Sequence, residues 1–252
     1  MEHHRFPSCF GNRDTSKGNA LFVILIGIVL LGALTLAATQ GARTTANMTV
    51  SKERAMTDIA QVSRYTGAVR KAINNMRLMN GCTETQISFE NPVVAGYTNG
   101  SAPGDNRCHV FNPAGGGLTW KSPPPGMNDG SDYEFSSRGQ IWGQGETVLT
   151  ALYRRLDLAV YLRNVTQSHC TAVNDQSGIT GIPIDSGDLD VVLFTGAYPV
   201  TGADTYDNIN GCPAAAPCSL PHDSSPLYGH AYGCFQEEDT GEYIIYSTLL
   251  AR

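Results

Sequence analysis

The chain begins its hydrophobic pattern with one uninterrupted apolar run, from Ala20 to Ala38, in which no charged residue occurs. As a helix that rises 1.5 Å per residue, this run spans about 28 Å, close to the ~30 Å hydrocarbon core of a bilayer. A cleaved secretory signal has a shorter apolar segment, and a buried core helix is seldom apolar on every face. The pattern therefore predicts a transmembrane helix over residues 20–38.

A second periodic stretch follows at residues 50–80. Its apolar face recurs at spacings of three and four residues, as in an amphipathic helix; the positions are Ile59, Val62, Thr66, Val69, Ile73 and Met76. Gly81 supplies a C-terminal stop. Residues 39–50 are rich in Thr, Asn and Gly, which have weak helix propensity. Two interpretations stay open: one helix through 20–80, or an anchor and a linker before a separate helix.

After Cys82 the pattern changes to short β-type segments between loops rich in Gly, Pro, Asn and Ser. Strands are predicted at residues 86–90, 107–111, 117–120, 156–162 and 188–196, with hairpin turns at 137–139 and 239–241. A short helix is predicted over 166–174, with Thr166 as its N-cap. The sum is an α+β fold, in which a long N-terminal helix packs on an antiparallel sheet with a small second helix.

Seven cysteines divide unevenly about the apolar run. Cys9 precedes it, and the other six follow: Cys82, Cys108, Cys170, Cys212, Cys218 and Cys234. An even set suits three disulfides in an oxidising compartment, although six cysteines allow 15 pairings. The favoured set joins Cys82, at the end of the long helix, to Cys108 in the second predicted strand. Cys212 pairs with Cys218 across the intervening residues PAAAP, and Cys170 pairs with Cys234.

The start of the apolar run carries a family resemblance. Lys17-Gly18 directly precedes Asn19-Ala20-Leu21-Phe22-Val23-Ile24-Leu25. This arrangement resembles the prepilin-type leader of type IV pilins and type II secretion pseudopilins. In that family a prepilin peptidase cuts after the glycine, and the new N-terminus is methylated. The resemblance implies cleavage between Gly18 and Asn19.

Two positions depart from the family pattern. The family usually has Phe or Met at the first mature position and Glu at the fifth, where this chain has Asn19 and Val23. The departures indicate a minor, atypical member. The resemblance also implies assembly with other pilin or pseudopilin subunits through the apolar helix, which begins with Leu21, Phe22, Val23, Ile24 and Leu25.

The resulting organisation has three parts: a cytoplasmic leader at 1–18, a long helix at 19–81 and an extracytoplasmic β-rich head at 82–252. Basic residues in the leader (Arg5, Arg13 and Lys17) favour a cytoplasmic N-terminus. The expected location is the bacterial inner membrane, crossed once, with the head in the periplasm or outside the cell.

Composition and motifs limit the chemistry. The net charge is −6, and no basic patch large enough for a nucleic acid occurs. No catalytic motif or cofactor motif is present, so the chain is not expected to be an enzyme. One calcium loop is a candidate, at Asp185, Asp188 and Asp190, because oxygen ligands in a loop suit Ca²⁺; a solvated acidic turn is the alternative.

These observations predict a structural, pilin-like subunit of a type IV pilus or type II secretion filament. Its expected partners are the inner membrane, prepilin peptidase and other subunits. The alternative is a membrane-anchored periplasmic binding module that does not polymerise. The pattern does not distinguish pilus, secretion and competence filaments.

Overall fold

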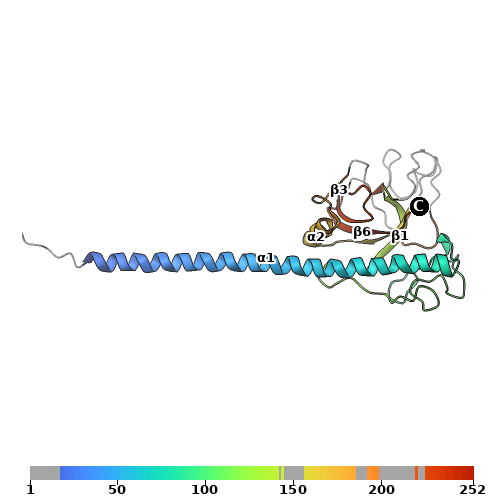
Figure 1. Ribbon diagram of the computed structural model, residues 1–252, viewed down its shortest axis with the longest axis horizontal. Coiled ribbons are helices and arrows are strands. Elements are labelled where there is room, and N and C mark those ends of the chain that lie inside the picture. The colour runs from blue at the N-terminus through green and yellow to red at the C-terminus, as the bar shows by residue number, and fades with distance from the viewer. Residues whose placement is uncertain (1–17, 142, 145–155, 186–191, 199–218, 221–224) are drawn as a thin grey trace, which may run out of the picture. The chain divides into compact units, whose positions relative to one another are not determined.

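The computed structural model describes residues 18–141, 143–144, 156–185, 192–198, 219–220 and 225–252; at 18–20, 36–51, 140, 185 and 219–220 it describes the backbone alone. The chain divides into two compact units, residues 1–50 and 51–252. Figure 1 labels the elements along the chain.

Helix α1 runs from Gly18 to Met79 without a break, so the continuous helix is the correct one of the two interpretations. From residue 51 on, it is amphipathic. Every position of the predicted apolar face is buried there. After the last helical residue, Met79, the predicted stop residue Gly81 has a φ of 65°, and the next residue, Cys82, donates its N–H to the Met76 carbonyl.

The membrane-spanning helix predicted at 20–38 is not upheld. Among the residues that the structure describes, no helix is both long and apolar enough to cross a membrane. The predicted location, a single-pass inner-membrane protein, is corrected with it.

The second unit is built on a sheet with the strand order β3-β5-β6-β2-β1-β4. Four strands form its antiparallel centre: β1 (Glu134–Ile141), β2 (Asp157–Leu162), β5 (Tyr232–Glu237) and β6 (Tyr243–Leu250). Two-residue strands, β3 (Ile184–Asp185) and β4 (Ser219–Leu220), pair in parallel with β5 and β1 at the two edges. The predicted α+β class with an antiparallel sheet is therefore confirmed.

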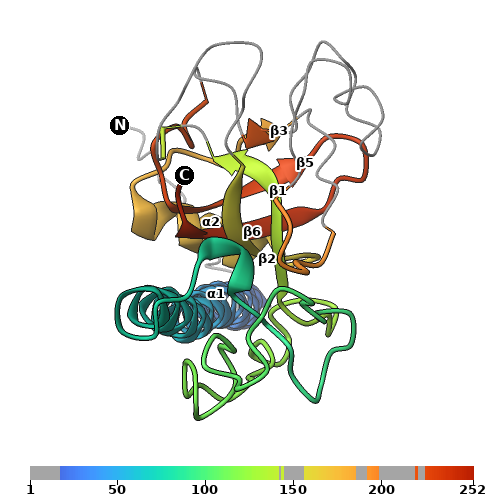
Figure 2. The same cartoon turned by 90° about the vertical axis from the view of Figure 1, so that its right-hand side faces the viewer.

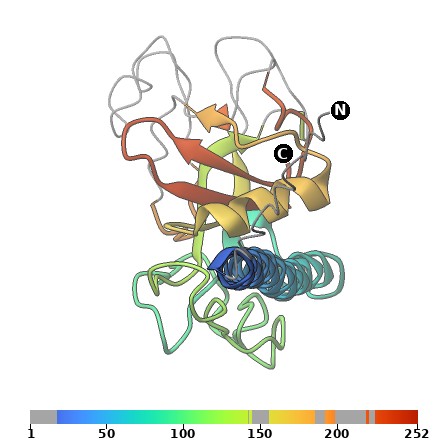
Figure 3. The ribbon, with the colours of Figure 1, turned by 90° about the vertical axis from the view of Figure 1, so that its left-hand side faces the viewer.

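Two short helices complete this unit. Helix α2 (Gln167–Ser177) follows the predicted N-cap Thr166 and ends at Gly178, whose φ of 75° places it in the left-handed region. A 3₁₀ turn, η1 (Glu84–Gln86), follows the disulfide cysteine Cys82. Figures 2 and 3 show α2 and the end of α1 beside the sheet, with the 82–133 segment winding past α1.

The sheet buries apolar side chains on both faces. In β2, Leu158, Val160 and Leu162 belong to the cluster that includes α1 and α2, whereas Ala159 and Tyr161 belong to a second cluster. This alternation follows from the two-residue period of a strand. Because both faces are covered, all six residues of β2 are buried, which fits its position inside the sheet.

Several predicted strands are wrong. Residues 86–90, 107–111 and 117–120 contribute only one isolated bridge, between Ser88 and His109. Aromatic packing holds this region instead: the rings of Phe89 and Phe135 stack 4.2 Å apart, and those of Phe111 and Trp120 meet edge to face at 5.1 Å. The apolar pattern thus marked buried positions but not a ladder of backbone hydrogen bonds.

Two further predictions need correction at the sheet. The hairpin at 137–139 is absent, since β1 passes through these residues as one strand with a bulge between Ser136 and Gly139. Of the strand predicted at 188–196, residues 192–196 are not extended in a ladder, and 188–191 lie outside the described residues. The strand at 156–162 and the hairpin at 239–241 are confirmed.

Candidate functional site

The most unusual surface of the described residues is the apolar stretch of α1. Eleven large side chains between Leu21 and Leu34 are 41–72% exposed: Leu21, Phe22, Val23, Ile24, Leu25, Ile26, Ile28, Val29, Leu30, Leu31 and Leu34. Scattered exposed hydrophobics are normal on proteins, whereas a contiguous patch of this kind marks an interaction surface. All five residues named from the sequence for assembly, Leu21–Leu25, lie in it; we call residues 21–35 the apolar surface.

The apolar surface has a hollow. Ile24, Ile28, Leu31 and Thr35 border a depression of about 490 Å³ together with Gly27 and Gly32. A methyl group built on either glycine would meet no atom within 4 Å. The depression therefore exists because these two glycines lack side chains, and it lies directly beside branched side chains that project.

The predicted processing site is described only in part. Gly18 is the first residue of α1, and Asn19 is helical too, with no description of their side chains. The leader before Gly18 lies outside the described residues.

Among the described cysteines of the second unit, two disulfides form, and they have the pairing favoured from the sequence. Cys82 joins Cys108 across 26 residues, and Cys170 joins Cys234 across 64. The first joins Cys82, three residues after the end of α1, to Cys108 within the 82–133 segment, and the second links α2 to β5. The third predicted pair, Cys212 and Cys218, lies outside the described residues.

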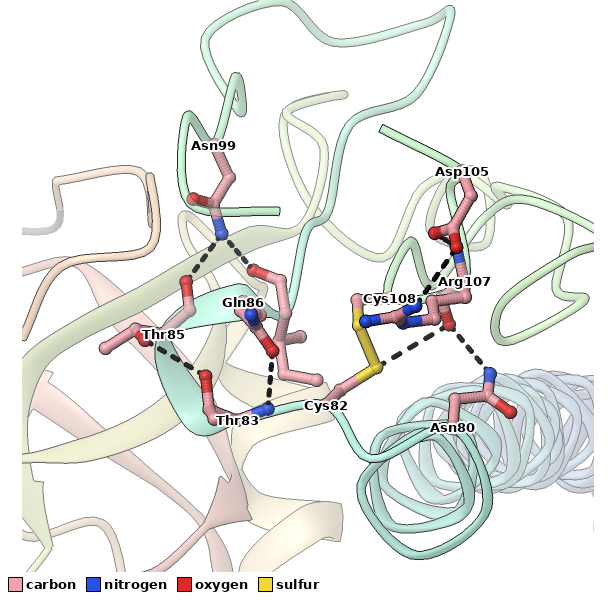
Figure 4. The surroundings of a disulfide bond; sticks show 10 residues. Asn80, Cys82, Thr83, Thr85, Gln86, Asn99, Asp105, Arg107 and Cys108 are labelled. Carbon is pink, nitrogen blue, oxygen red and sulfur yellow. Dashed lines mark hydrogen bonds and ion pairs between the residues drawn. A yellow bond between two sulfur atoms is a disulfide. The ribbon is translucent and has the colours of Figure 1, made fainter. Parts of the chain in front are cut away.

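Polar contacts surround the Cys82–Cys108 disulfide (Figure 4). Asn80 donates its side-chain N–H to the Arg107 carbonyl at 2.7 Å. The buried Asn99 donates to the carbonyls of Thr85 and Ile87 at 2.9 and 2.7 Å. These bonds satisfy backbone groups that no strand ladder serves, so the segment after α1 is held by side chains rather than by a sheet.

A second buried asparagine acts in the same way near the other disulfide. The side chain of Asn174 donates to the carbonyls of Gly181 and Cys234, both at 2.8 Å, and accepts the Cys234 N–H at 2.8 Å. Since Asn174 is in α2 and Cys234 in β5, it reinforces the connection that the Cys170–Cys234 bridge makes.

One constellation of side chains was missed in the sequence. Thr166 Oγ1 lies 2.7 Å from His169 Nδ1, and His169 Nε2 lies 3.2 Å from Asp58 Oδ2. The order hydroxyl, imidazole, carboxylate is that of nucleophilic hydrolases. The Thr166–His169 contact, however, spans three residues at the N-terminus of α2, and both His169 and Asp58 are buried. The geometry directly shows a hydrogen-bonded contact that connects α2 to α1.

Helical spacing could have suggested the contact between Thr166 and His169, because an N-cap residue and the residue three positions later are neighbours. Asp58 is 111 residues away from His169 and carries no local signal.

The calcium candidate cannot be assembled from the described residues. Asp188 and Asp190 lie outside them, and Asp185 is described by its backbone alone, in β3. Among the described residues, no group of three or more His, Cys, Asp or Glu side chains is placed to hold a metal ion.

Comparison with known proteins adds little. No protein-family model matches the chain, and no solved structure matches it. One similarity is to a highly reducing polyketide synthase, ltbA, from Aspergillus luteorubrus, with 35% identity over 83 residues. The match covers 31% of this chain and 2% of that protein. It is a partial similarity to a very long enzyme, and it carries no activity over to this chain.

The comparisons correct the family assignment. The pilin and pseudopilin resemblance rested on Lys17-Gly18 and the apolar run after it. No pilin family matches, and the similarity reported above is to an unrelated class of protein. A short motif followed by apolar residues specifies composition more than it specifies a fold, and the cleavage, methylation and prepilin peptidase inferred from it lose their support.

Proposed function

We propose that this protein is a non-enzymatic assembly subunit. Its copies associate through the apolar surface at residues 21–35, and each copy carries one disulfide-bridged α+β domain. The observation that carries the proposal is the exposure of eleven large apolar side chains on one helical stretch. Covering such a surface removes apolar area from water and stabilises a complex by roughly 25 cal/mol per Å² before the costs of association.

The occupant that fits this surface is a second copy of the same surface. Ile24, Ile28 and Leu31 project beside the hollow at Gly27 and Gly32. A surface that has both projections and a hollow can fill its own hollow when two copies meet, as a symmetric contact requires. Packing of projecting side chains into holes is also the way in which neighbouring helices join.

The distribution of the apolar side chains predicts an assembly larger than a dimer. Residues 21–26 are consecutive and all apolar and exposed, so they point to every side of the helix. One partner helix covers one stripe and leaves the rest in water. Covering every side of the helix therefore takes more than one partner.

Sedimentation of the full chain over a range of concentrations tests this proposal. We expect wild type to form species larger than a dimer, and Ile28→Glu or Leu31→Glu to weaken association by at least about tenfold, since each places a charge in the contact. Leu78→Glu is the matched control, because Leu78 is 81% exposed on the same helix but outside the apolar surface. It should associate like wild type.

Three results would contradict the proposal. One is a wild-type chain that stays monomeric up to roughly 100 µM. Another is an equal loss of association in the Leu78→Glu control. The third is a monomer that binds neutral lipid vesicles through this surface without self-association. Thermal unfolding of each variant checks that the α+β domain is intact.

A binding module that does not polymerise is the second candidate. It is favoured by a separate observation, a pocket in the α+β domain with cationic residues in its lining. The two candidates differ in the sedimentation experiment, where only the first predicts concentration-dependent assembly.

A further inference from the structure

A pocket of about 560 Å³ opens between α1 and the loop at residues 117–124. Its volume is within the range of small-molecule sites. Helix α1 supplies Gln61, Arg64 and Tyr65 to the lining, and the loop supplies Thr119, Lys121 and Ser122. The backbone N–H of Lys121 donates to Tyr65 Oη at 3.4 Å, so the loop is attached to the helix at the pocket itself.

Two cations line this pocket without a carboxylate partner. Within the described part of the chain, neither Arg64 nor Lys121 forms an ion pair, whereas Arg77, Arg107 and Arg163 have carboxylate oxygens at 2.9–3.1 Å. Arg64 uses only Nε, which donates to the Ala60 carbonyl at 3.0 Å. The two terminal nitrogens of its guanidinium remain able to donate a pair of parallel hydrogen bonds to a carboxylate.

The remaining lining indicates what the anion is attached to. Gln61, Thr119 and Ser122 carry neutral groups that donate and accept hydrogen bonds, which suits hydroxyl groups. Tyr65 and Tyr133, whose ring centroids are 5.0 Å apart, form an apolar wall. Hydroxyls, a carboxylate and an apolar ring face occur together in an acidic sugar.

The same lining disfavours a bare inorganic anion. Phosphate has neither the ring hydroxyls that Gln61, Thr119 and Ser122 would bind nor a ring face for the wall of Tyr65 and Tyr133, so it makes fewer of these contacts than an acidic sugar.

We propose that this pocket binds an acidic saccharide, with Arg64 and Lys121 on the carboxylate and Gln61, Thr119 and Ser122 on the ring hydroxyls. This site lies wholly within residues 61–133, so it does not depend on assembly through residues 21–35.

Calorimetric titration of the full chain with two carboxylated probes, trigalacturonic acid and sialyllactose, tests the proposal. At least one should bind saturably. Its binding should weaken roughly tenfold or more in Arg64→Gln and in Lys121→Gln, because each removes a charged hydrogen-bond donor. Lys71→Gln is the matched control: it makes the same charge change at another exposed position of α1, outside the pocket, and should change affinity less than about twofold.

The methyl ester of the bound probe separates the carboxylate from the sugar, and it should bind at least roughly tenfold more weakly. Inorganic phosphate should bind more weakly still. The proposal is overturned if neither probe saturates below about 10 mM. It is also overturned if phosphate or the ester binds as tightly as the acid, or if Lys71→Gln matches the pocket variants.

Discussion

Gly139 lies inside β1, at a point where the side chain of Tyr161 from the neighbouring strand β2 passes over it. A Cβ atom built at Gly139 would collide with the Tyr161 hydroxyl oxygen. We expect Gly139→Ala to lower the free energy of unfolding by about 1–3 kcal/mol, as overpacking does elsewhere. Tyr161→Phe removes the colliding oxygen, so the double variant should recover part of this loss.

Gly67→Ala provides the matched control for that experiment. Gly67 is exposed within α1, and a Cβ there meets nothing within 4 Å. The same substitution should stabilise the protein by about 0.5–1 kcal/mol because alanine favours a helix interior. Urea unfolding measures the stability of both variants. A Gly139→Ala variant as stable as wild type would show that Tyr161 moves away from the added methyl group without an energetic cost.

Asp157, the fully buried first residue of β2, sets a pH dependence. Its Oδ2 accepts the Ile141 N–H at 2.7 Å and its Oδ1 accepts the Arg252 N–H at 2.9 Å. Burial nevertheless dominates, and it raises the pKa of Asp157 to about 6 from an ordinary value of 3.8. Between these values the folded state holds more protons than the unfolded one, so stability is greatest below pH 3.8 and falls as pH rises through 6.

The size of that loss is about 3 kcal/mol at most. Asn cannot ionise, so in Asp157→Asn the free energy of unfolding should fall less between pH 4 and 6 than it does in wild type. At pH 7 the amide nitrogen of the introduced Asn would face one of the two N–H donors, and this lost hydrogen bond offsets the stability gained by removing a buried charge. Urea midpoints of both proteins at four pH values make the test, and parallel curves would exclude Asp157 as the cause.

At the scale of elements, the two disulfides close loops of different length. Cys82–Cys108 spans 26 residues and Cys170–Cys234 spans 64. If a bridge stabilises the fold mainly by lowering the entropy of the unfolded chain, these two bridges raise the free energy of unfolding by about 3.5 and about 4.3 kcal/mol respectively. We expect Cys170→Ala/Cys234→Ala to lower the unfolding midpoint more than Cys82→Ala/Cys108→Ala. Chemical denaturation of the two double variants compares them, and the reverse order would mean that strain or packing, not loop length, decides.

The elements also show which parts of the fold local pattern determines. Strand β2, helix α2 and the β5–β6 hairpin were predictable, because each combines a clear period with a cap or turn residue: Thr166 for α2 and Gly241 for the hairpin. The hairpin predicted at 137–139 is wrong because Gly139 does not mark a turn: it lies inside β1, where the absence of a side chain leaves space for the Tyr161 hydroxyl of β2.

The candidate sites divide in a similar way. The apolar surface was visible in the sequence, since consecutive residues compose it. The pocket at Arg64 and Lys121 and the His169–Asp58 contact were not, because their members are 57 and 111 residues apart. The sequence around one member of each pair does not indicate where the other member lies.

At the scale of the whole molecule, the two compact units predict separable properties. Among the residues whose side chains the structure describes, both buried clusters draw only on positions from Ala55 onward. A chain that begins at residue 51 should therefore unfold cooperatively within about 3 °C of the intact protein, yet fail to associate, because it lacks the apolar surface. Circular dichroism and sedimentation give the two readouts, and the intact chain carrying Leu78→Glu serves as the comparison. A truncated chain without a cooperative transition would contradict the separation.

The strand order has a consequence for the time at which the domain can form. Among the described strands, β6 is the last in sequence and lies between β5 and β2, so the β1–β2 pair reaches β5 within the sheet through β6. While the chain emerges from a ribosome, β2 has no partner on that side until residues 243–250 are available. The sheet therefore closes after synthesis of its last strand, and the half-finished chain keeps the open edge of an apolar strand exposed throughout elongation.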